Sequence, residues 1–142
     1  MKQRAVFDTS TLVGAIIRSN SVPYQALSVA LNSYELCVSA ETLAELEKVL
    51  ARQRFARYFS IEARLAFVEV IRSEATKVEV DTPSPLDLTP LCRDPKDIRF
   101  LALALAAHAD VIVSSDQDLL VLNPWRGIPI VTPTQFMAKF SI

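Results

Sequence analysis

Acidic side chains occupy the ends of several apolar segments of this 142-residue chain. Asp8 and Asp116 close strand-like runs, and Asp94 and Asp97 open a helical one. Glu45 lies early in another helical segment, which follows a strand-like run. In an open α/β sheet, ligands bind at the carboxyl ends of the strands. Carboxylates gathered at that edge repel one another, and a hard divalent cation relieves the repulsion. The pattern therefore predicts a Mg²⁺ or Mn²⁺ site, and a metal site of this kind suggests a hydrolase.

The residues that other hydrolytic mechanisms need are scarce. With only two glycines, Gly14 and Gly127, the chain has neither a GxGxxG motif nor a phosphate-binding P-loop. The single histidine, His108, excludes a two-histidine ribonuclease mechanism and makes a Ser-His-Asp triad or an imidazole metal site a poor fit. The two cysteines, Cys37 and Cys92, form neither a disulfide framework nor a zinc site. The chemistry must therefore depend on carboxylates.

Short apolar runs alternate with longer helical patterns, which is typical of βαβ units and a parallel sheet. The expected strands are 4–7, 35–39, 77–80, 111–114 and 129–131. The expected helices are 23–32, 41–52, 61–74, 100–109 and 134–140. We therefore expect one domain spanning residues 1–142, with a three-layer α/β/α, Rossmann-like architecture around a central, mainly parallel sheet of about five strands. The proline-rich segment 81–95 should be a loop that delivers Asp94 and Asp97 to the carboxyl end of the sheet.

Composition indicates a soluble globular protein, because 51% of the residues are hydrophobic and 22% are charged. The longest uncharged apolar run, 100–109, is about half the ~20 residues that a membrane span needs. The first residues lead directly into a strand and lack the long apolar region of a signal peptide. We therefore expect a cytoplasmic protein with no membrane association.

A structural role explains each acid when it is considered alone. Asp94 precedes a proline and suits a helix N-cap, a role that we favour for it over metal ligation. Asp116 could simply cap a short helix, and Asp118 could be a solvated acid in its first turn. Glu45 borders the apolar stripe of its helix, whereas Glu41 lies further toward solvent, so Glu45 is the better candidate. Such roles do not explain why separate segments bring acids to the same edge.

Four ordered blocks resemble the motifs of PIN-domain proteins, and the resemblance covers nearly the whole chain: Phe7–Ser10, Ser39–Leu46, Asp94–Asp97 and Ser114–Leu120. It is greatest to the bacterial PIN proteins described as toxins of toxin–antitoxin pairs. By this resemblance, the family's four acidic positions are Asp8, Glu45, Asp97 and Asp116, and its less regular fifth is Asp118. Ser10 and Ser114 match hydroxyl positions beside the first and last acids, and Ser114 replaces a more usual threonine.

The resemblance implies metal-assisted hydrolysis of single-stranded RNA that leaves 5′-phosphate and 3′-hydroxyl ends. We expect Asp8, Asp97 and Asp116 to hold Mg²⁺ or Mn²⁺, directly or through water. Glu45 would complete the shell or orient the attacking water, and Asp118 is a further candidate ligand. Supporting polar roles would belong to Ser10, Ser114 and Asp94. The implied protein partners are an antitoxin and a second copy of the chain, forming a homodimer; the number of metal ions stays open.

Cationic and aromatic residues alternate in the segment 52–59. The net charge of −1 and a pI of about 5.8 exclude a strongly basic surface over the whole molecule. Arg52, Arg54 and Arg57 stand next to Phe55 and Tyr58, a combination that suits single-stranded RNA through phosphate attraction and base stacking. The same residues would equally suit an ordinary solvated helical pair, an antitoxin surface or a subunit interface.

Other function classes fit less well. A haloacid-dehalogenase-like phosphatase needs a second aspartate two residues after the first, where this chain has Ser10. A response-regulator receiver needs paired acids after the first strand and a lysine after a late strand, and neither is present. The main alternative is a catalytically inactive PIN-fold module that binds RNA or a protein partner.

Overall fold

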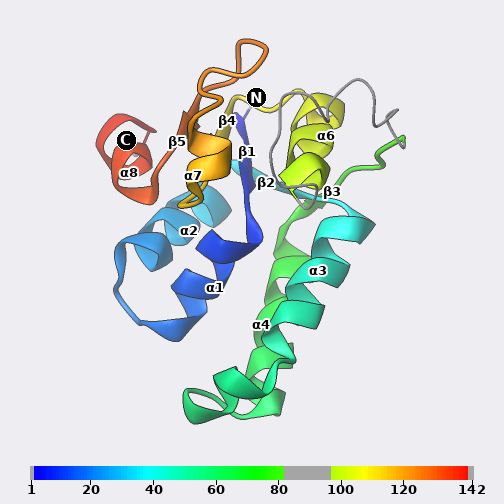
Figure 1. The fold of residues 1–142 in the computed structure, drawn as a ribbon, viewed down its shortest axis with the longest axis vertical. Helices are drawn as coiled ribbons and strands as arrows, with labels where there is room; N and C mark the ends of the chain where they lie inside the picture. The colour runs from blue at the N-terminus through cyan, green and yellow to red at the C-terminus, as the bar shows by residue number, and fades with distance from the viewer. Residues whose placement is uncertain (1, 82–96, 141–142) are drawn as a thin grey trace.

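A computed structural model describes residues 2–81 and 97–140, and these residues form a five-stranded parallel sheet (Figure 1). The strands are β1 (Arg4–Phe7), β2 (Glu35–Val38), β3 (Thr76–Lys77), β4 (Val111–Val113) and β5 (Ile130–Val131). They lie in the order β3-β2-β1-β4-β5, with β1 in the middle. The expected α/β class and parallel central sheet are therefore confirmed. From β1 the chain adds β2 and β3 on one side and β4 and β5 on the other. The position between β1 and β4 is therefore the switch point of the topology, where open α/β sheets bind ligands.

Helices cover both faces of this sheet (Figure 1). One face packs against α1 (Thr9–Ile17), α2 (Val22–Ser33), α3 (Ala40–Leu50), α4 (Ile61–Glu74) and α8 (Pro133–Phe140). The other face packs against α6 (Ile98–Ala107) and α7 (Gln117–Leu120). Alternation along β1 explains this division, because Ala5 and Phe7 enter the first core and Val6 enters the second.

Local sequence signals account for most of the helix boundaries. Ser39 caps α3 as expected: its hydroxyl accepts the backbone N–H of Thr42, whose own side chain accepts the N–H of Ser39. The all-apolar segment forms α6, which is largely buried against the sheet. Helix α3 ends at Leu50 rather than Arg52, and a short 3₁₀ helix, η1 (Gln53–Arg57), follows it.

Helix α1 is absent from the sequence-based prediction. Its sequence is rich in β-branched residues and contains Gly14, both of which lower intrinsic helix propensity. It is nevertheless helical because Asp8 caps its first turn and because Leu12, Val13 and Ala15 are buried in the core. Tertiary burial here outweighs local propensity.

The third strand lies earlier and is shorter than predicted. The structure places β3 at Thr76–Lys77, whereas the sequence predicted residues 77–80. Thr76 and Lys77 pair with Cys37 and Val38 of β2. After the strand, the backbone N–H of Val78 still donates to the carbonyl of Val38 at 2.8 Å, and Val78 and Val80 pack against the core on the α6 side.

Within the residues that the structure describes, no helix is both long and apolar enough to cross a membrane. The role predicted for Asp94 falls outside the described residues, as does most of the loop predicted at 81–95.

Candidate functional site

Asp8 lies at the end of the central strand and is almost fully buried, with 3% of its surface exposed. It is the N-cap residue of α1, and its Oδ1 accepts hydrogen bonds from the backbone N–H and the hydroxyl of Thr11, at 3.0 and 2.6 Å. The hydroxyl of Ser10 lies 3.1 Å from both carboxylate oxygens. Both oxygens of Asp8 are therefore fixed in position by neighbouring donors.

Ser114 connects Asp8, the first acid of the chain, with Asp116. Its hydroxyl donates to Oδ2 of Asp8 at 2.6 Å and accepts the backbone N–H of Asp116 at 2.9 Å. The side chain is fully buried at the end of β4. The hydroxyl role predicted for Ser114 thus has a geometric basis: one group orients the Asp8 carboxylate and the main chain that carries Asp116.

The pKa of Asp8 is raised above its ordinary value of 3.8, mainly because burial penalises the charged form. Hydrogen bonds from Ser114, Thr11 and Ser10 act in the opposite direction and favour the carboxylate. A positive charge brought into the site would favour the ionised form further. The burial of Asp8 is therefore well suited to a site that binds a cation.

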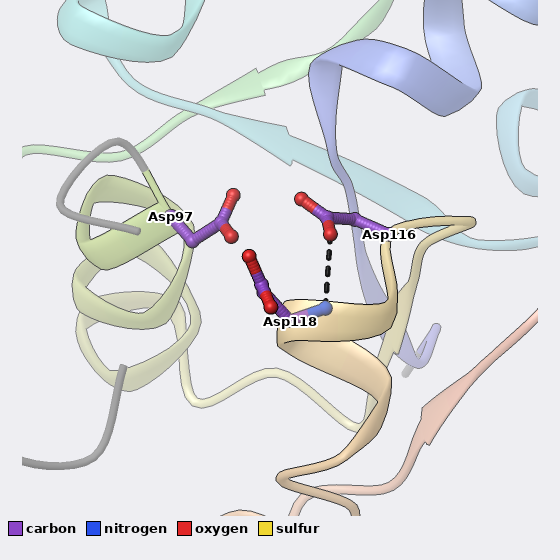
Figure 2. Close-up of side chains that lie close together, drawn as sticks. All are labelled: Asp97, Asp116 and Asp118. Atoms are coloured by element: carbon purple, nitrogen blue, oxygen red, sulfur yellow. Dashed lines mark hydrogen bonds between the residues drawn. The ribbon is translucent and has the colours of Figure 1, made fainter. Parts of the chain in front are cut away.

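Three other aspartates bring their carboxylates together at the same edge of the sheet (Figure 2). Asp97 lies at the start of α6, and Asp116 and Asp118 lie at the start of α7. One oxygen from each lies within 4.8 Å of the others. Asp116 also caps α7 by accepting the backbone N–H of Asp118 at 2.9 Å. An all-oxygen donor set of this kind fits Mg²⁺ or Mn²⁺.

Glu45 does not belong to this group of three aspartates. Its Oε2 is 2.9 Å from Nη1 of Arg99, and only 14% of its side chain is exposed. The side chain of Glu41 is 68% exposed, and its Oε1 lies 3.9 Å from the Nε of Arg99. Glu45 is thus the acid of α3 that turns inward, as the sequence indicated, but it does so in an ion pair.

A cleft of about 580 Å³ joins the acidic residues. Its lining includes four of the predicted acids, which come from four separate segments: Asp8, Glu45, Asp97 and Asp116. Cationic and aromatic side chains from the segment after α3 line it as well: Arg52, Arg54, Phe55, Arg57 and Tyr58. Arg54 lies over the ring of Phe55 at 4.8 Å, and Arg57 over Tyr58 at 5.6 Å. We call these five residues the basic wall of the cleft.

Two residues of the site were not identified from the sequence. Thr11 follows Asp8 by three positions, the spacing of an N-cap and its N3 residue, so capping rules could have found it. Arg99 reaches Glu45 across 54 positions of sequence, and no spacing rule connects them.

Comparison with known proteins gives one family and a set of similar folds. Residues 4–118 match the family model described as the PIN domain. Among curated proteins, none is similar enough in sequence to count as a relative. A chain in the crystal structure of VapBC2 from Rickettsia felis, bound to a DNA fragment from its promoter, aligns with a TM-score of 0.65 and 14% identity. That alignment covers 92% of this chain and 98% of the other.

Two further solved structures share the fold. PAE2754 from Pyrobaculum aerophilum aligns with a TM-score of 0.64 and 14% identity, covering 96% of this chain and 88% of that chain. A chain of DNA-bound VapBC from Salmonella typhimurium aligns with a TM-score of 0.64 and 18% identity, covering 92% of this chain and 98% of that chain. At sequence identities of 14% to 18%, the similarity to these structures shows a shared fold.

Proposed function

This chain belongs to the PIN domain family, and on that premise we propose that it is a metal-dependent ribonuclease that hydrolyses phosphodiester bonds of single-stranded RNA. The observation that carries the proposal is the cleft, which combines four inward-facing acids with a basic wall. Acids alone would repel a polyanion. A cation bound among them and the arginines beside them would together allow a phosphate to approach.

The residues that would hold Mg²⁺ or Mn²⁺ are Asp97, Asp116 and Asp118, whose oxygens already lie close together. Asp8 lines the same cleft and is the fourth candidate ligand, directly or through water. When bound, the cation would neutralise phosphate charge and lower the pKa of a bound water. Asp8 contributes a negative charge that Ser114 and Thr11 hold in a fixed orientation.

Glu45 has a different role in this proposal. Arg99 fixes its carboxylate, which faces the cleft without joining the group of three aspartates. We assign Glu45 to orienting the attacking water and accepting its proton. Water attacks phosphorus, the bond from phosphorus to the 3′ oxygen breaks, and that oxygen takes up a proton. The products carry a 5′-phosphate and a 3′-hydroxyl.

Substrate class and site are tested together by presenting one sequence in three forms to the purified protein with Mn²⁺. The forms are end-labelled single-stranded RNA, its duplex and the corresponding single-stranded DNA. We expect cutting of the single-stranded RNA with 5′-phosphate products, and loss of that cutting in Asp116→Asn. Equal cutting by the variant would mean a contaminating nuclease. No cutting of any form would favour the inactive binding module.

We further propose that the ribonuclease is a cytoplasmic toxin paired with an antitoxin. The support is the resemblance to bacterial PIN toxins together with the fold shared with VapBC chains. Induced expression in a bacterial host should arrest growth, and Asp97→Asn should relieve the arrest at equal protein level. A growth curve unaffected by the wild-type protein would contradict the toxin role while leaving RNA processing possible.

A further inference from the structure

Arg64 is a buried cation at the start of α4, next to the segment that connects α3 to α4. It lies in the first turn of α4, and only 5% of its surface is exposed. Its hydrogen bonds go to main-chain carbonyls: Nη1 donates to Leu50 at 2.6 Å and to Arg52 at 3.2 Å, and Nε donates to Ser60 at 3.3 Å. Within the described residues, the hydrogen-bond acceptors of this guanidinium are all main-chain carbonyls.

These three carbonyls lie at the two ends of one segment. Leu50 is the last residue of α3, and Ser60 is the N-cap of α4. The carbonyls at the end of a helix lack intrahelical partners and carry partial negative charge, so a buried guanidinium is a favourable partner for them. Because one planar group donates in several directions, Arg64 fixes both ends of segment 51–60 relative to α4.

Segment 51–60 carries the whole basic wall of the cleft. The segment itself is weakly anchored, since Phe55 is the buried residue of η1 and the cationic side chains around it are exposed. A short 3₁₀ helix with one buried side chain has few contacts with which to resist local opening. Its position at the cleft therefore depends on the burial of Phe55 and on the contacts at its two ends.

We propose that Arg64 is a positioning residue for RNA binding, which clamps segment 51–60 so that Arg52, Arg54, Arg57 and Tyr58 face the acidic edge before RNA arrives. The proposal rests on the proposed function for its RNA readout. Its physical basis is preorganisation: a wall held in place in the free protein loses less conformational entropy on binding. Arg64 itself touches no substrate.

The clamp is tested first without RNA. Trypsin cleaves after arginine, so the bonds after Arg52, Arg54 and Arg57 report how often the segment opens under native conditions. Arg64→Met keeps most of the side-chain stem and removes the guanidinium. The matched control is Arg72→Met, the same change on the same helix, where the arginine pairs at the surface with Glu47 and Glu69. We expect faster cleavage at the three bonds, identified by mass spectrometry, in Arg64→Met alone.

The second readout is RNA cleavage. A loosened wall should raise KM for a single-stranded RNA about tenfold, equivalent to about 1.4 kcal/mol. The value of kcat should change by less than about twofold, because the acids lie on other segments and uniform binding affects KM alone. Arg72→Met should match the wild type in both. Where Arg64→Met does not fold, as judged by circular dichroism, Arg64→Lys is used: it keeps the charge but removes the fork of donors.

The outcomes separate the clamp from the proposed function. Unchanged tryptic cleavage of the segment would overturn the proposal. A fall in kcat with KM unchanged would also overturn it, because that result indicates general damage to the catalytic acids. Faster tryptic cleavage combined with a higher KM supports it. If the wild-type protein cuts no RNA, the proposed function fails, and faster tryptic cleavage in Arg64→Met would still establish the clamp.

Discussion

Asp8 both caps α1 and lines the acidic cleft. It caps α1 and is enclosed by hydroxyl donors, yet burial still raises its pKa. A raised pKa means that the folded, metal-free protein disfavours the carboxylate. The protonated form of Asp8 contributes its full stabilisation when the pH is below 3.8, the ordinary pKa of the group. This stabilisation is lost as the pH rises through the raised pKa of the folded protein. Binding of a cation would reverse this preference.

Removing the hydroxyl of Ser114 should shift the pH dependence of the reaction. That hydrogen bond lowers the pKa of Asp8, so Ser114→Ala should raise the pKa further. The acidic limb of a kcat/KM profile should therefore move to higher pH, and stability should fall by about 1–3 kcal/mol through the lost buried bond. Ser114→Thr, which keeps the hydroxyl, should retain the wild-type limb. Identical profiles for the alanine and threonine variants would contradict the role assigned to Ser114.

Repulsion among the clustered aspartates should be measurable in the metal-free protein. Asp116→Asn removes one of three neighbouring charges, while its side-chain oxygen can still accept the N–H of Asp118. We expect the metal-free melting temperature to rise by about 3 °C, which corresponds to about 1 kcal/mol for a domain of this size.

Mn²⁺ provides the complementary measurement on the same variant. Millimolar Mn²⁺ should stabilise the wild type by mass action, by about 2.7 kcal/mol at a hundredfold excess over Kd, and should stabilise Asp116→Asn less. Calorimetric melting curves that respond to neither the substitution nor the metal would contradict a metal site here.

At the level of residues, the sequence indicated the acids because strand ends and helix starts can be recognised locally. Asp8 and Asp116 follow buried strands, and the parallel sheet brings their segments to one edge. The Glu45–Arg99 pair could not be anticipated, because it depends on how α3 and α6 pack. Arg64 did leave a signal, since it shares helical spacing with the buried Val68 and Ile71. Leu65, the apolar residue next to it, is exposed instead.

Among the elements, the connection between α3 and α4 is the one whose function is least evident from pattern. From sequence alone, the stretch with Arg52, Arg54 and Arg57 is equally consistent with an ordinary solvated surface. The structure shows that these arginines line the same cleft as the acids. Helix α1 and strand β3 were also not predicted correctly from local sequence. The burial of α1 and the ladder of β3 depend on neighbouring elements that lie far away in the sequence.

Neutralising the basic wall should weaken RNA binding without disturbing the acids. A combined Arg52→Ala, Arg54→Ala and Arg57→Ala variant should bind single-stranded RNA more weakly in fluorescence anisotropy. The log–log salt slope should become shallower by about 0.7 for each phosphate that the variant no longer neutralises.

The matched control for the basic wall removes three cations that do not line this cleft, with alanine at Lys2, Arg72 and Lys77. It carries the same change in net charge. Equal weakening by both variants would indicate a general electrostatic effect and remove the basic wall from the RNA path.

For the whole molecule, the decisive property is the order of the sheet. Because β1 and β4 are neighbours, the acid after β1 and the acids after β4 meet at the position where strand order reverses. Helix α6 then adds Asp97 from one face and α3 adds Glu45 from the other. The net charge of −1 does not indicate this local organisation. Acids and arginines occupy separate parts of one cleft, and their charges largely cancel in the total.

The measurement that tests this account most directly is cleavage of end-labelled single-stranded RNA by the wild type and by Asp97→Asn. Each is assayed with Mn²⁺, with Mg²⁺ and with EDTA, and Glu62→Gln on the exposed start of α4 is the matched control. The account predicts cutting by the wild type and the control only with a divalent metal, and none by Asp97→Asn. Cutting that survives EDTA, or that proceeds at the wild-type rate in Asp97→Asn, would contradict it.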